Sequence, residues 1–112
     1  ERAAVALQAG LEERAAARLF GRLPRDLADR FRNLWEEFEA RETPESRLAN
    51  SLDRLQPILN YYYSAGKSCR DIGITRDQVR ERNRIVADGA PELWHYIEEL
   101  LQRAVDQGML KD

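Results

Sequence analysis

The feature that most constrains the fold of this chain is a helical spacing of apolar residues. Between residues 25 and 41 the large apolar side chains are Leu27, Phe31, Leu34, Trp35 and Phe38. These positions are i, i+4, i+7, i+8 and i+11, so on a helix they form a single stripe. The segment is therefore predicted to be an amphipathic helix with one buried face.

Two flanking segments show the same spacing. Residues 2–22 carry an apolar stripe, and Gly21 and Pro24 mark the end of this predicted helix. Thr43 and Pro44 suit the N-cap and first position of a third helix. Pro57 lies deep inside that helix and is expected to kink it or to end its regular hydrogen bonding.

The C-terminal part predicts two more helices after a loop at residues 64–74. Thr75 and Gln78 form a capping-box pattern, and Gly89 ends the fourth helix. Pro91 opens the fifth, and Gly108 stops it. We therefore predict an all-α fold, an irregular bundle of about five helices, with residues 1–112 forming a single helical domain.

Length, charge and hydropathy narrow the class of protein. The 112 residues include 18 basic and 20 acidic side chains, so no basic excess favours nucleic acid. No apolar run approaches the roughly 20 residues that span a bilayer, and no leader pattern is present. The lone cysteine, Cys69, excludes an internal disulfide. These features predict a cytoplasmic protein that binds neither membrane nor nucleic acid.

Asp53 is the first candidate for chemistry. It follows Leu52, so it lies about 100° around the helix from the leucine stripe. A carboxylate at this edge can point into a cleft between helices and ligate a hard cation. The alternatives are an ordinary boundary carboxylate and a partner for Arg47 or Arg54.

Other candidates are weaker on spacing alone. Glu37 belongs to an acidic cluster opposite the aromatic stripe, which is usually a solvated face. His95 is the only histidine and has no second ligand at metal-binding spacing. Cys69 lies between Lys67 and Arg70 but has no base nearby in sequence, so it is interpreted as a loop or core thiol.

A DNA-binding alternative comes from residues 73–79, which match the turn and recognition-helix start of a helix-turn-helix motif. Arg80, Arg82 and Arg84 follow. Only six residues separate Gly66 from Gly73, too few for the first helix that such a motif needs.

Several short motifs follow one another along the chain. They are Arg18-Leu19-Phe20-Gly21-Arg22-Leu23-Pro24, Leu34-Trp35-Glu36-Glu37-Phe38-Glu39, Thr43-Pro44-Glu45-Ser46-Arg47-Leu48 and Leu52-Asp53-Arg54-Leu55-Gln56-Pro57, followed by Gly73-Ile74-Thr75 with Gln78-Val79 and by Gly89-Ala90-Pro91-Glu92-Leu93-Trp94. Their order resembles bacterial HD-domain phosphohydrolases, especially the 5′-deoxynucleotidase branch. The resemblance covers nearly the whole chain.

The resemblance implies a helical bundle that holds one divalent metal through a His, a His-Asp pair and a later Asp. Asp53 matches the later Asp, and Glu37 matches a glutamate expected to contact the nucleotide sugar. The implied reaction is hydrolysis of a nucleotide-type phosphate monoester. A homodimer and a nucleotide-like small molecule are the expected partners.

The chain departs from this pattern because it lacks the histidine ligands. His95 is followed by Tyr96 and lies after Asp53. The chain also starts without methionine inside a predicted helix. We therefore expect this chain to be the C-terminal part of an HD domain. It is expected to contain no catalytic residue of its own and to be inactive alone. The divalent ion is expected only if the missing ligands exist in the parent protein. The alternative is a non-enzymatic helical module for interaction or dimerisation.

Overall fold

The computed structural model describes residues 1–64 and 73–112 and, in those ranges, contains six helices and no strand. It forms two compact units, residues 1–40 and 41–112. The all-α prediction is confirmed. The structure leaves open whether the two units make one domain, so the single-domain assignment stays a prediction. None of the described helices combines the length and apolarity needed to cross a bilayer.

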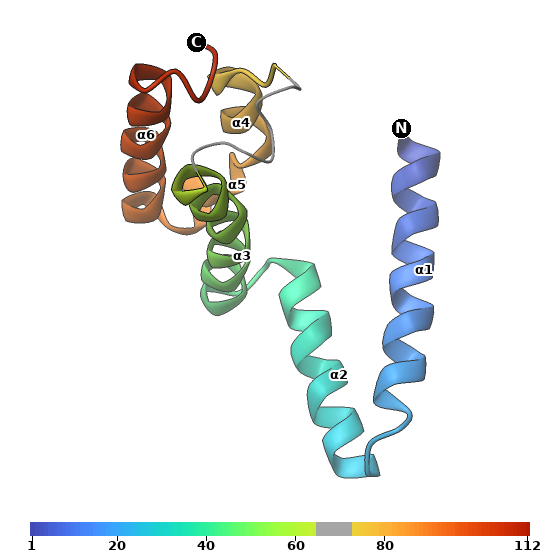
Figure 1. The fold of residues 1–112 in the computed structure, drawn as a ribbon. Helices are drawn as coiled ribbons and strands as arrows, with labels where there is room; N and C mark the ends of the chain where they lie inside the picture. Colours follow the sequence, from blue (N-terminus) through green and yellow to red (C-terminus); the bar gives the residue numbers. More distant parts are fainter. Residues whose placement is uncertain (65–72) are drawn as a thin grey trace. The chain divides into compact units, whose positions relative to one another are not determined.

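Unit 1 is a hairpin of α1 (Arg2–Phe20) and α2 (Arg25–Ala40), shown in Figure 1. The backbone N–H of Gly21 bonds to the Ala17 carbonyl at the end of α1. Phe20 and Trp35 pack with ring centroids 6.4 Å apart, and Arg32 forms an ion pair with Glu13. These contacts connect the two helices.

Unit 1 buries little apolar surface. Ala16 is the only buried residue of α1, and α2 has none. Leu7 and Leu11, one turn apart on α1, are 67% and 56% exposed. The amphipathic pattern correctly located α2, but the predicted buried face is half-exposed within the hairpin.

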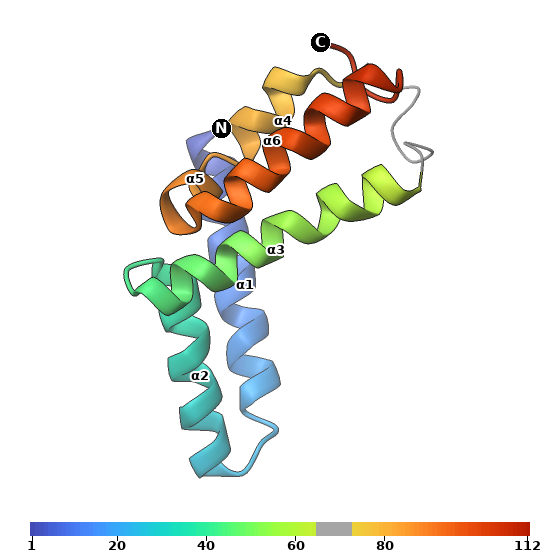
Figure 2. The ribbon, with the colours of Figure 1, turned by 90° about the vertical axis from the view of Figure 1, so that its left-hand side faces the viewer.

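Unit 2 contains the core and consists of α3 (Pro44–Tyr63), α4 (Arg76–Arg82), α5 (Ile85–Gly89) and α6 (Pro91–Asp106). Figure 2 shows α6 running alongside α3 in the same direction. Helices α3, α5 and α6 supply most of the buried cluster, in which Val86 and Ile97 are completely buried. The buried cluster comprises Leu55, Ile58, Val86, Ile97, Leu101, Ala104 and Leu110.

The helix starts in unit 2 follow the expected local signals. The Thr43 hydroxyl accepts a hydrogen bond from the Ser46 N–H, and Pro44 is the first residue of α3. Thr75 and Gln78 form a complete capping box at α4. Pro91 begins α6. Each of these starts matches its predicted position.

Helix α3 continues past Pro57 to Tyr63, so the loss of regular hydrogen bonding at this residue is local. One prediction about helix continuity needs correction. The predicted fourth helix is split at Asn83 and Arg84 into α4 and α5. Asn83 donates its side-chain N–H to the Val79 carbonyl, an interaction that caps α4. The chain then turns so that Val86 enters the core.

Candidate functional site

Asp53 lies on the face of α3 that points away from the core of unit 2. Its side chain is exposed, whereas Ser51 and Leu55, two positions away on either side, are buried. Two helical positions correspond to a rotation of about 160–200°, so Asp53 is nearly opposite both. The leucines Leu48 and Leu52 on the neighbouring strip of α3 are also half-exposed. The Asp53 carboxylate is therefore presented outward.

The Asp53 carboxylate has no ion pair or hydrogen bond to another residue in the part of the chain that the structure describes. Neither Arg47 nor Arg54 pairs with it there. Arg47 instead donates through Nε to the Arg41 carbonyl at 3.2 Å. The alternative of a pairing with Arg47 or Arg54 therefore has no support among residues 1–64 and 73–112, whereas an exposed Asp53 agrees with an ordinary boundary carboxylate.

The backbone at Asp53 is affected by Pro57. In an α-helix the N–H of residue i bonds to the carbonyl of residue i−4, and Pro57 has no N–H. Its missing donor would have served the carbonyl of Asp53. Pro57 itself is exposed, and α3 continues on both sides of it. The helix is thus locally weakened one turn after the candidate ligand.

Glu37 lies on α2 and is partly buried. Glu37 belongs to unit 1, whereas Asp53 belongs to unit 2. The position of each residue is therefore described only relative to its own unit. The assignments of Asp53 to metal and of Glu37 to substrate both stay predictions.

Within the described residues, no group of three or more His, Cys, Asp or Glu side chains could hold a metal ion. The His95 side chain is 82% exposed on α6, with Nε2 3.5 Å from the Glu99 carboxylate. Cys69 lies outside the described residues. Asp53 is an oxygen donor of the kind that divalent ions prefer, and a complete site would need further ligands beside it.

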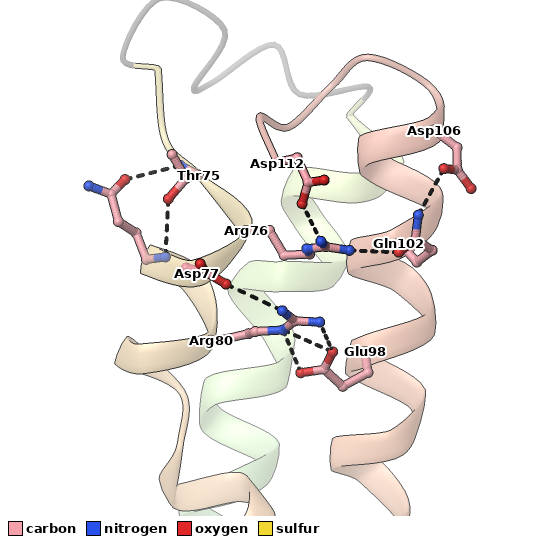
Figure 3. A network of polar contacts seen from close by, with 9 residues as sticks. Thr75, Arg76, Asp77, Arg80, Glu98, Gln102, Asp106 and Asp112 are labelled. Atoms are coloured by element: carbon pink, nitrogen blue, oxygen red, sulfur yellow. Dashed lines mark hydrogen bonds and ion pairs between the residues drawn. The ribbon is translucent and has the colours of Figure 1, made fainter.

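A polar network that the sequence did not reveal joins α4 to α6 (Figure 3). The Arg80 guanidinium binds both oxygens of Glu98, with Nη2 2.5 Å from Oε2, and also contacts Asp77 at 3.3 Å. Hydrogen bonding to Glu98 raises the pKa of Arg80 further above its usual range. Arg80 and Glu98 are 18 positions apart in the sequence, so no local pattern identifies the pair.

The same network extends toward the C-terminus. Arg76 forms an ion pair with Asp112 and a 2.6 Å hydrogen bond to Gln102, which in turn donates to Asp106 (Figure 3). Arg84 pairs with Glu81 at 3.7 Å. Three of the four arginines at positions 76–84 are therefore engaged by carboxylates, which weakens the positive field that a DNA-contacting helix needs. The preceding residues 65–72 lie outside the described part.

Among the described residues of unit 2 lie two partly open cavities that Asp53 does not line. The first, about 250 Å³, is lined by residues of α3, α4, α6 and the C-terminal segment. The second, about 460 Å³, lies between α3 and α5 and is lined by polar and charged residues. Its lining comprises Arg41, Arg47, Asn50, Ile85, Asp88 and Gly89.

Comparison with known proteins and protein families gives one match. No curated protein and no solved structure matches it. A family model described as an HD domain matches residues 2–94, most of the chain and both candidate site residues, Glu37 and Asp53. The chain belongs to the HD-domain family.

Proposed function

We propose that this chain is part of a metal-dependent phosphohydrolase that acts on nucleotide-type phosphate monoesters. The observation that carries the proposal is the family match over residues 2–94, which includes a carboxylate, Asp53, that faces outward. HD-domain proteins generally bind divalent metals, and a carboxylate oxygen is a suitable donor for such ions.

In this proposal Asp53 is one ligand of the metal, and the histidine ligands come from residues outside this chain. The bound ion would polarise the phosphoryl group and lower the pKa of a coordinated water. Asp53 would supply one carboxylate ligand from α3. Glu37 is proposed to contact the sugar of the nucleotide. With His95 as their single histidine, the 112 residues alone do not supply these histidine ligands and are expected to be inactive.

The test is phosphatase activity of the protein at its natural length, measured on 2′-deoxynucleoside 5′-monophosphates with Mn²⁺, Co²⁺ or Mg²⁺. We expect Asp53→Ala to lower the rate by at least about a hundredfold, because a ligand of the catalytic ion is lost. Asp88→Ala, at an exposed carboxylate on α5, is the matched control and should retain the rate. Equal rates in the wild type and Asp53→Ala would remove Asp53 from the site.

A second candidate function, homodimerisation of a helical module, is favoured by the exposed leucines of α1. Leu7 and Leu11 lie one turn apart on the same side of α1, and a second copy of the chain is the proposed occupant of this side. We expect sedimentation equilibrium to give a dimer that Leu7→Glu with Leu11→Glu converts to monomer. The control pair Gln8→Glu and Glu12→Gln changes the same helix without changing its leucines. A monomeric wild type at about 100 μM would contradict the proposal, because specific dimers usually associate well below that concentration.

A further inference from the structure

The 250 Å³ cavity of unit 2 is lined mainly by apolar side chains from several elements. Ile58 comes from α3, Val79 from α4, Leu101 from α6 and Leu110 from the C-terminal segment. The hydroxyl of Tyr61, another lining residue, donates to the Met109 carbonyl and so connects α3 to this segment. The cavity is part of the folded unit and is distinct from the Asp53 carboxylate.

Two arginines, Arg54 from α3 and Arg82 from α4, also line this cavity. Neither has an ion pair with any residue the structure describes, in contrast to Arg76, Arg80 and Arg84. No Asp or Glu is among the lining residues within the part of the chain that the structure describes. The cavity thus combines an apolar lining with two cationic groups. Among residues 1–64 and 73–112, no Asp or Glu pairs with either of them.

We propose that this cavity binds a small amphipathic monoanion, such as a medium-chain carboxylate. The apolar chain would pack against Ile58, Val79 and Leu101, and the carboxylate would accept hydrogen bonds from Arg54 and Arg82. A guanidinium presents paired donors that match a carboxylate. The volume of about 250 Å³ is roughly eight times that of one water in the liquid, so the ligand has on the order of ten non-hydrogen atoms.

Octanoate is a suitable probe, and octanol is its uncharged counterpart. Both are titrated into the protein by isothermal calorimetry with EDTA present, so the result is independent of any metal site. We expect octanoate to bind about tenfold more tightly than octanol, because partly exposed ion pairs add a moderate gain. In ¹H–¹⁵N spectra the octanoate-induced shifts should centre on Val79, Leu101 and Leu110.

Arg54→Gln with Arg82→Gln should reduce octanoate affinity to that of octanol, and each single variant should lose about threefold. Arg103→Gln, at an exposed arginine of α6 outside the cavity, is the matched control and should bind like the wild type. Because all three positions are at the surface, the helical circular dichroism should be retained. Equal affinities for octanoate and octanol, unchanged binding by the double variant, or shifts centred outside the cavity would overturn the proposal.

Discussion

Gly89 shows how a single residue allows α5 to approach α3. A Cβ at this position would lie 2.8 Å from the Ser51 Oγ and 2.9 Å from the Arg47 carbonyl oxygen. Both distances are shorter than van der Waals contact, and one partner is backbone that cannot rotate away. The sequence identified Gly89 only as a helix stop, because the close neighbour is about 40 residues earlier in the chain.

We predict that Gly89→Ala lowers the free energy of unfolding by about 1–3 kcal/mol, because the added methyl group forces α3 and α5 apart. Urea denaturation followed by circular dichroism measures this change. Gly10→Ala is the control, since a Cβ at Gly10 meets nothing within 4 Å. It should stabilise α1 by about 0.5–1 kcal/mol. A neutral Gly89→Ala would contradict the close packing.

Asp53 illustrates what residue spacing can and cannot predict. Its offset of about 100° from Leu52 correctly places it off the apolar stripe. Spacing alone could not decide between an inter-helix cleft and an outward face. The structure gives an outward face within unit 2, because the core lies on the side of Ser51 and Leu55. Residues that would bind a metal ion together with Asp53 lie far from it in the sequence or outside this chain, so local spacing does not identify them.

At the scale of elements, helix starts were predictable and interruptions were not. Caps such as Thr75 with Gln78 act within one turn, so sequence shows them directly. The break between α4 and α5 has no Gly or Pro signal. It depends on Asn83 capping α4 and on Val86 packing into the core, which requires the tertiary structure. Pro57 removes one backbone donor, yet α3 continues beyond it to Tyr63.

Because α3 continues through Pro57, replacing this residue should strengthen the helix. Pro57→Ala supplies an N–H for the Asp53 carbonyl and removes a poor helix former. We expect the free energy of unfolding to rise by about 1–3 kcal/mol in urea denaturation. Gln56→Ala, at the neighbouring exposed position, is the control and should change it by less than about 0.5 kcal/mol. A destabilised Pro57→Ala protein would show that the proline ring packs against its neighbours.

At the scale of the whole molecule, the two units differ in how much core they bury. Unit 2 has a contiguous cluster around Ile97 and Val86, whereas unit 1 buries only Ala16. The helical period predicted both sets of helices, because it depends only on local spacing. It could not reveal this imbalance, nor pairs such as Arg80 and Glu98, because these depend on how elements assemble. The candidate metal centre is the hardest feature to predict from local sequence. Metal sites are recognised by the spacing between several ligands, and Asp53 is a single ligand.

Binding of Mn²⁺ tests the central claim that Asp53 is a metal ligand most directly. Free Mn²⁺ is counted by electron paramagnetic resonance during titration of the protein at its natural length, with Asp88→Ala as control. We expect the wild type and Asp88→Ala to bind one ion each, and Asp53→Ala to bind it at least about tenfold more weakly. Equal Mn²⁺ affinity in Asp53→Ala and wild type would contradict the account.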